Sequence, residues 1–218
     1  MSTSRTVTIG GIDYPYVKIG DQYWLAKNLQ LDITSSTYHY SPYGAYYDVT
    51  EINSGIASKL ASLGITGWHV PTIEEFNTMV DFVVSDTGSS QRRDAGRYLL
   101  ADMDNTYGLS LVRCGSYDGR SGYQHVTDDG STAIYGERSD DDTYTNRVSI
   151  GSSLYINGNE GTYRKYCIRL VTNQDPDPGP GPGPGPDNDS NSRICFATSF
   201  VIYGGCMLVY NGLRYHQT

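Results

Sequence analysis

The residues best suited to recognition chemistry lie between positions 117 and 144, where aromatic and charged side chains are interleaved. Tyrosine offers a large contact area and loses little rotamer entropy, and arginine offers several donors, so both are frequent at binding hot spots. The candidate ligand-binding residues are Tyr117, Arg120, Tyr123, His125, Tyr135, Arg138 and Tyr144. The alternative is that these tyrosines only pack locally between loops.

Patterns typical of catalysis or metal binding are missing from the sequence. The four histidines have no zinc-site spacing, and the four cysteines include no Cys-x-x-Cys pair. Neither a Gly-x-Ser-x-Gly elbow nor a phosphate-binding loop occurs. Acidic clusters at 102–105 and 140–142 have the hard oxygen ligands that calcium prefers, but neither completes an EF-hand loop. We interpret both clusters as solvated loops, and we expect no catalytic residue, metal or cofactor.

The cysteines have a simpler interpretation. Cys114 and Cys167 lie in strand-like runs, and free cysteine is among the residues most often buried. We therefore expect two buried thiols. A bridge between Cys195 and Cys206 depends on the redox compartment and stays open.

Composition excludes several classes of partner. The net charge of −8, without a basic run, disfavours nucleic acid. No apolar run approaches the ~20 residues of a membrane span. The first seven residues contain no apolar signal region. That leaves synthesis in the cytoplasm, a start after a removed signal, or a virion component released by lysis.

The elements that would position these residues follow from periodicity. A β meander is predicted over residues 6–25, with turns at Gly10-Gly11 and Gly20-Asp21. Apolar spacing predicts one helix over 54–63 and a second after Thr72 and Glu75, which form a capping-box pattern. A third helical stretch is expected within 95–103. Short strands are then predicted at 109–112, 132–135, 147–150 and 166–170. The fold class is α+β, with two main helices and antiparallel strands.

The C-terminal part has a different composition. Proline and glycine alternate over 178–186, which predicts an extended linker over 174–192 after a domain at 1–173. Residues 193–218 are the most apolar stretch, yet too few to bury a core alone. We expect a β-hairpin-like segment that docks on another surface. Its apolar assembly residues are Ile194, Phe196, Phe200, Ile202, Met207, Val209 and Tyr210.

Four blocks, in order, resemble the Fibrobacter succinogenes major paralogous domain. They cover 16–29 (YVKIGDQYWLAKNL), 67–76 (GWHVPTIEEF), 108–117 (GLSLVRCGSY) and 166–171 (YCIRLV), within a match that spans roughly residues 7–172. The stretch at 135–139 (YGERS) departs from a WSS block that the family often has, so the local binding surface differs.

The resemblance implies a C-type-lectin-like fold with its ligand face on the loops before the last strands. It also implies a non-enzymatic receptor-binding part of a Bacteroidetes-type phage virion, such as a fibre or capsid decoration. We expect a homo-oligomer, with a trimer favoured, that contacts other virion proteins through residues 193–218 and a host glycan or protein through the loops. The alternatives are a cell-surface or secreted adhesin and an enzyme of the formylglycine-generating type.

Overall fold

The computed structural model describes residues 5–118 except 36, the backbone of strands at 125–127, 133–137, 145–150 and 154–160, residues 164–177, and the backbone of strands at 197–203 and 206–212. Within these strands the side chain of Val148 is also described, and it is buried. The chain divides into two compact units, Met1–Asp177 and Pro178–Thr218.

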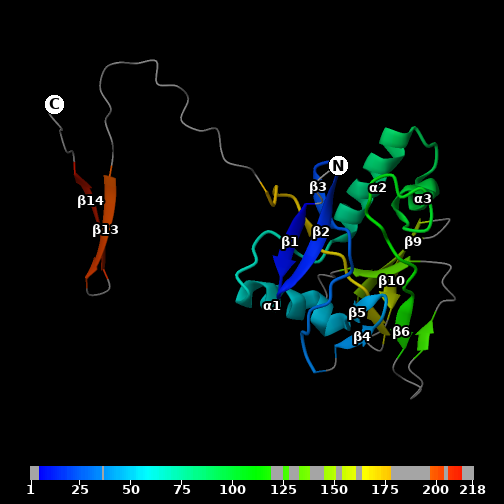
Figure 1. Cartoon of the computed structure of the whole chain (residues 1–218), viewed down its shortest axis with the longest axis horizontal. Helices are drawn as coiled ribbons and strands as arrows, with labels where there is room; N and C mark the ends of the chain where they lie inside the picture. Colours follow the sequence, from blue (N-terminus) through cyan, green and yellow to red (C-terminus); the bar gives the residue numbers. More distant parts are fainter. Residues whose placement is uncertain are drawn as a thin grey trace. The chain divides into compact units, whose positions relative to one another are not determined.

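Strands from both ends of the first unit form one antiparallel sheet. It contains β1 (Thr6–Ile9), β2 (Ile12–Ile19), β3 (Gln22–Leu25) and β12 (Val171–Thr172), in the order β1-β2-β3-β12 (Figure 1). The predicted meander is confirmed with one difference. Residues 12–19 form a single strand through Pro15, which lies opposite Thr6 at the start of β1. This is an end position, where a missing backbone donor is tolerated.

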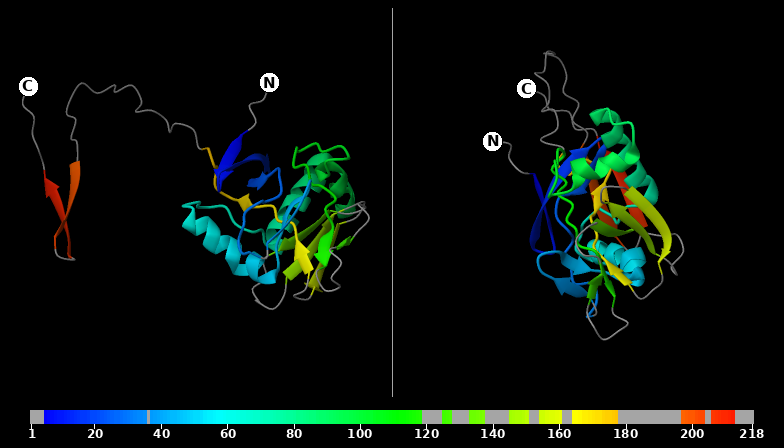
Figure 2. Two further views of the ribbon diagram at one scale, coloured as in Figure 1. Left: turned by 60° about the horizontal axis from the view of Figure 1, so that its bottom comes forward. Right: turned by 90° about the vertical axis from the view of Figure 1, so that its right-hand side faces the viewer.

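Helices form in all three predicted stretches, although the first helical segment begins at Glu51, three residues before the predicted start. A π-helical turn, η1 (Glu51–Gly55), leads directly into α1 (Ile56–Ser62). α2 (Ile73–Thr87) starts at the predicted capping box of Thr72 and Glu75 and ends at Gly88 in the left-handed conformation. A 3₁₀ turn, η2 (Arg92–Asp94), precedes a short α3 (Ala95–Leu99). α1 lies well apart from α2 and α3 (Figures 1 and 2).

The described residues of the first unit also form three small antiparallel sheets. The hairpin of β4 (Tyr38–Tyr40) and β5 (Gly44–Tyr46) stands beside the sheet β11-β6-β7, formed by β11 (Arg164–Tyr166), β6 (Ser116–Asp118) and β7 (His125–Thr127). The third sheet has the order β10-β9-β8, from β10 (Leu154–Glu160), β9 (Thr145–Ile150) and β8 (Ala133–Glu137). These elements confirm the α+β class.

Two strand predictions are wrong. Residues 109–112 form only an isolated bridge between Leu111 and Leu100. Gly108 and Ser110 both have positive φ, which is incompatible with an extended run. Residues 167–170 also lie outside the regular strands, because β11 ends at Tyr166 and β12 begins only at Val171. Between them, the carbonyls of Ile168 and Leu170 accept hydrogen bonds from the backbone N–H groups of Leu29 and Leu25. Apolar alternation correctly predicted that both segments contain buried residues, but it did not predict their backbone conformation.

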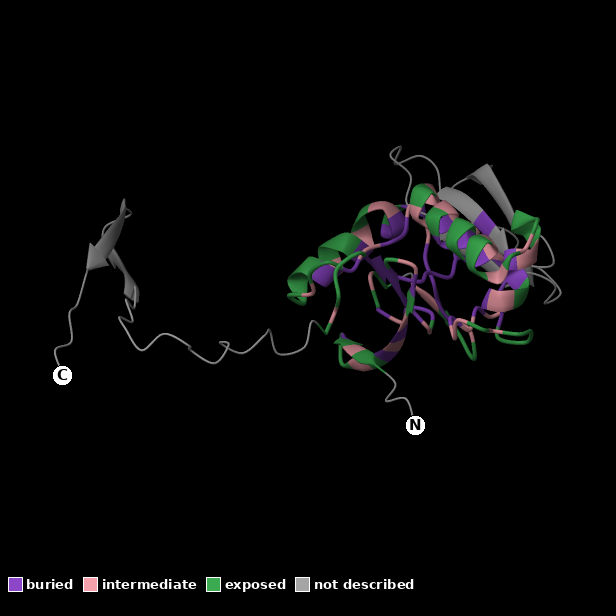
Figure 3. Ribbon diagram, turned by 90° about the horizontal axis from the view of Figure 1, so that it is seen from above, coloured by how far each residue is buried: buried purple, intermediate pink, exposed green. Residues whose placement is uncertain are grey.

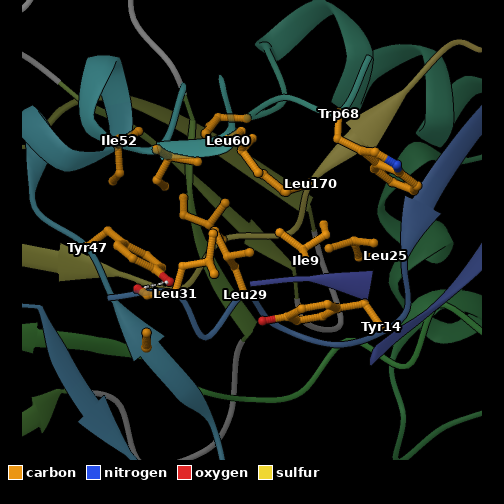
Figure 4. Close-up of a cluster of buried hydrophobic side chains, with 14 of the residues drawn as sticks. Ile9, Tyr14, Leu25, Leu29, Leu31, Tyr47, Ile52, Leu60, Trp68 and Leu170 are labelled. Atoms are coloured by element: carbon orange, nitrogen blue, oxygen red, sulfur yellow. Dashed lines mark hydrogen bonds between the residues drawn. The ribbon is translucent and has the colours of Figure 1, made fainter. Parts of the chain in front are cut away.

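Among the residues whose burial is described, the core consists of two apolar clusters. One contains Trp24 and the inner face of α2, with Phe76, Met79, Val80 and Val83. The other contains Ile9, Tyr14 and Leu25 from the first sheet and Leu60 from α1, and Figure 4 shows how these side chains converge with Trp68 and Leu170. The outer sides of α1 and α2 are exposed (Figure 3). The second unit contains the hairpin of β13 (Ala197–Tyr203) and β14 (Cys206–Gly212).

Among the helices that the structure describes, each is too short or too polar to cross a lipid bilayer.

Candidate functional site

The β4–β5 hairpin is rich in tyrosine, with Tyr38 and Tyr40 in β4, Tyr43 in the turn and Tyr46 in β5. Tyr40 to Tyr43 form its turn, in which the Tyr43 N–H donates to the Tyr40 carbonyl at 2.7 Å across a cis Ser41–Pro42 peptide bond. Gly44 follows with φ +101°, and an added Cβ there would meet the Leu29 carbonyl oxygen at 3.3 Å. The hairpin is therefore pressed against residues 28–30, and this contact fixes its position.

Backbone pairing brings this hairpin beside β6. Tyr47, directly after β5, exchanges two hydrogen bonds of 2.9 Å with Tyr166 of β11. Tyr166 in turn lies opposite Ser116 of β6. β11 is thus the strand through which residues near position 40 and residues near position 117 meet.

Four tyrosines form a stacked row at this junction, which we call the tyrosine array: Tyr117, Tyr38, Tyr40 and Tyr43. Ring centroids of Tyr38 and Tyr117 are 4.1 Å apart with an interplanar angle of 26°. Tyr40 stacks on Tyr38 at 6.4 Å and on Tyr43 at 5.9 Å. Tyr40 is 42% exposed, whereas the other three are half-buried. An ordered, partly exposed row of rings is suited to binding a ligand because its shape is set before the ligand arrives.

The surroundings of Tyr38 affect its protonation. Burial, followed by the neighbouring phenols of Tyr117 and Tyr40, raises the pKa of Tyr38. Its hydroxyl therefore stays neutral at physiological pH and keeps a proton to donate. Tyr38 therefore presents a neutral donor and a ring face.

A shallow hollow lies next to the array. Its volume is about 190 Å³, and it is lined by Gln30, His39, Tyr40, Ser41, Pro42 and Gly44. The imidazole Nε2 of His39 lies 2.7 Å from Asp32 Oδ1, which holds the ring in place. The hollow is smaller than a drug-sized pocket, at roughly 300–1,000 Å³, and matches a single small ring with polar groups.

The rings rest on a buried tyrosine that contacts both described cysteines. Tyr46 packs against Tyr38 with centroids 6.2 Å apart, and its hydroxyl donates to the Cys114 carbonyl at 2.5 Å. The Tyr46 hydroxyl also bonds the Cys167 side chain, and the thiols of Cys167 and Cys114 are hydrogen-bonded to each other. Both cysteines are fully buried and unbridged, as predicted. Burial raises the pKa of the Cys167 thiol well above its ordinary value.

A buried arginine stabilises the segments behind the hairpin. Arg169 donates from Nε to Asn28 Oδ1 at 2.6 Å and from Nη1 to the carbonyls of Leu25 and Leu109 at 3.0 and 3.1 Å. Nη2 donates to the Ser110 carbonyl at 2.7 Å. Asn28 then donates to the carbonyl of Tyr43, in the array, at 2.8 Å. The charged guanidinium of Arg169 thereby stabilises the irregular backbone segments behind the β4–β5 hairpin through strong hydrogen bonds.

A second hollow, of about 270 Å³, lies at the end of the first unit. Its lining includes Trp68, Ile65 and Val7, together with Asp175 and Pro176. The Asp175 carboxylate accepts a hydrogen bond from the Asp177 N–H at 3.0 Å, which orders this last segment. Residues 174–176 form part of its wall, so we regard this hollow as the seat of the segment that leaves the unit.

Of the predicted ligand-binding residues, Tyr117 lies in the tyrosine array. His125 and Tyr135 are described by their backbone alone, in β7 opposite Asp118 and in β8 opposite Val148. Arg120, Tyr123, Arg138 and Tyr144 lie outside the described residues. Of the assembly residues, Phe200 and Ile202 lie in β13, and Met207, Val209 and Tyr210 in β14. Ile194 and Phe196 lie outside the described residues.

Sequence reasoning missed Tyr38, Tyr40 and Tyr43. A signal was present, because five tyrosines and a Ser-Pro turn occur within residues 38–47. The acidic cluster at 102–105 is engaged internally: Asp102 pairs with Arg113 at 2.7 Å and Asp104 with Arg97 at 2.5 Å. Within the described residues, no group of three or more His, Cys, Asp or Glu side chains could hold a metal ion.

No family model matches the chain, and no match was found among curated proteins or solved structures.

Proposed function

We propose that the first unit is a non-enzymatic recognition module that binds its ligand through the tyrosine array, and that the second unit attaches it to an assembly. The single observation that carries this proposal is the row of stacked tyrosines with an open hollow beside it. In the organism the module is a receptor-binding part of a phage virion, and a surface adhesin is the alternative.

The ligand class proposed is a saccharide. One face of a sugar ring presents weakly positive C–H groups, which pack on the negative face of an aromatic ring. Polar side chains around the hollow, such as Gln30, His39 and Ser41, can bond the hydroxyls at the ring's edge. The hollow's volume of about 190 Å³ favours one sugar unit at this point over a larger apolar ligand. A protein loop presenting a similar polar ring is the second candidate.

The C-type-lectin-like fold and the family resemblance remain part of this proposal. Their support is that the four blocks that carry the resemblance meet around the last one. Val171 pairs with Trp24 of the first block and bridges His69 of the second. Arg169 bonds the carbonyls of Leu109 and Ser110 in the third. The blocks therefore form one structural nucleus, as expected if they define a shared fold.

The alternative of a formylglycine-type enzyme finds little support at the cysteines. The fold does bring Cys114 and Cys167 together, as such an enzyme would require. However, both side chains are fully buried, and burial raises the pKa of Cys167. A reactive thiol needs the opposite conditions, a lowered pKa and access for the substrate.

The proposed attachment role rests on the pattern of β13 and β14. Their register places Phe200 opposite Val209, and Val201 opposite Leu208. Neighbouring positions along a strand belong to opposite faces, so both faces of this hairpin carry apolar residue types. A two-stranded hairpin is at best marginally stable alone. We propose that it is covered on both faces in a homo-oligomer, for which a trimer is the favoured state.

Binding to an array of immobilised glycans tests the recognition proposal. The wild-type chain should bind one group of related glycans, and Tyr40→Ala should weaken that binding at least about tenfold, since truncating an aromatic hot spot costs about 2 kcal/mol or more and about 1.4 kcal/mol is tenfold. Met103→Ala is the matched control, because Met103 is 44% exposed but lies in the turn after α3. Equal binding by Tyr40→Ala and wild type would rule the array out as the ligand site.

A further inference from the structure

We propose that Cys114 and Cys167 are a disulfide-forming pair, cross-linked when the chain folds in an oxidising environment. This inference goes beyond the proposed function and does not depend on it. It begins from the position of the two thiols, which lie in the same buried cluster beside the paired strands β6 and β11 and interact with each other. The bond itself requires the two sulfur atoms to approach to about 2.05 Å.

The backbone on either side holds the two residues in place. Cys114 lies two residues before β6 and Cys167 one residue after β11, and these strands are paired by Ser116 opposite Tyr166. Tyr46 fixes both neighbours, since its hydroxyl donates to the Cys114 carbonyl and bonds the Cys167 side chain. The closely packed core leaves the pair few other arrangements.

The reaction is thiol–disulfide exchange with a low-molecular-weight disulfide such as oxidised glutathione. One cysteine thiolate attacks that disulfide and releases one glutathione thiol. The second cysteine then attacks the mixed disulfide, which forms the Cys114–Cys167 bond and releases the other thiol. In sum the protein loses two protons and two electrons, and the glutathione disulfide gains them.

Burial sets when this can happen. Both side chains are fully buried, so the oxidant cannot reach them in the folded unit. The cross-link must therefore form during folding or in an opened state. Once formed, it would close the loop from 114 to 167, which contains β6 to β11 and every predicted ligand-binding residue. Such closure restricts the unfolded ensemble and stabilises the fold.

The experiment uses the full chain with Cys195→Ser and Cys206→Ser, which leaves only the proposed pair. The reduced, unfolded chain is refolded in a mixture of reduced and oxidised glutathione. The expected product has lost about 2 Da, two hydrogen atoms. It resists alkylation after denaturation, and its Tm lies about 10 °C above that of the reduced form. The folded, reduced chain in the same mixture should keep both thiols for hours.

Adding Cys114→Ser or Cys167→Ser to this background provides the control, since neither variant can gain the internal bond. The proposal is wrong if the refolded chain keeps two alkylatable thiols or carries a glutathione adduct in place of the internal bond. Should refolding yield no folded protein, mass analysis of the same chain exported to an oxidising periplasm decides between these outcomes.

Discussion

Glu75 shows how one carboxylate can join distant parts of the chain. Its oxygens accept hydrogen bonds from His69 Nε2 at 2.7 Å, from the Thr72 N–H at 2.9 Å and from Asn173 Nδ2 at 3.2 Å. Burial alone would raise the pKa of Glu75, but these bonds outweigh it and the pKa is lowered. The ionised form therefore stabilises the folded state.

Glu75 makes the stability of the folded state depend on pH. Because the folded pKa lies below the unfolded value, the contribution is fully present above about pH 4.5 and is lost as the pH falls through the folded pKa. Glu75→Gln should lower the free energy of unfolding by about 1 kcal/mol at pH 7 and by much less near pH 3. Urea denaturation across this range measures the difference. The exposed Glu74, in the same turn, is the control. Glu74→Gln should change the free energy of unfolding by a similar amount at pH 7 and near pH 3.

At the scale of the element, the β4–β5 hairpin depends on the space around Gly44. Gly44→Ala introduces both an unfavourable φ and contacts of 3.3 Å with the Leu29 carbonyl and Asn28 Cβ. Gly11→Ala introduces an unfavourable φ of +80° with nothing within 4 Å. We expect a loss of about 1 kcal/mol for Gly11→Ala and at least about 2 kcal/mol for Gly44→Ala. Thermal unfolding compares them, and equal losses would mean that the hairpin is not held by residues 28–30.

Elements with local signals could be predicted from the sequence. The start of α2 follows from Thr72 and Glu75, which are three residues apart, and the turn at Gly10 follows from its neighbours. The tyrosine array has no local signal of this kind. Tyr38 meets Tyr117 only because β5 and β6 both lie beside β11. The same holds for Cys114 and Cys167, whose contact depends on strand pairing that periodicity does not encode.

At the scale of the whole molecule, attachment should depend on the second unit. The full chain of 24.0 kDa is expected to have the native mass of an oligomer, with three chains favoured. A chain ending at Asp177 should be monomeric yet folded, since its core clusters lie entirely within the first unit. Light scattering and native mass spectrometry check this. Val201→Asp in the full chain should also weaken association, and a monomeric full chain would contradict the proposed assembly.

The position of Arg169 and β12 has a consequence for biosynthesis. The carbonyls of Leu25, Leu109 and Ser110 and the free edge of β3 receive their partners from residues 169–172. A nascent chain that has emerged from the ribosome only as far as residue 160 lacks all of these partners. The first unit therefore completes its fold late in its own synthesis, and chaperone contact with the unfinished edge is expected until residue 172 has left the exit tunnel.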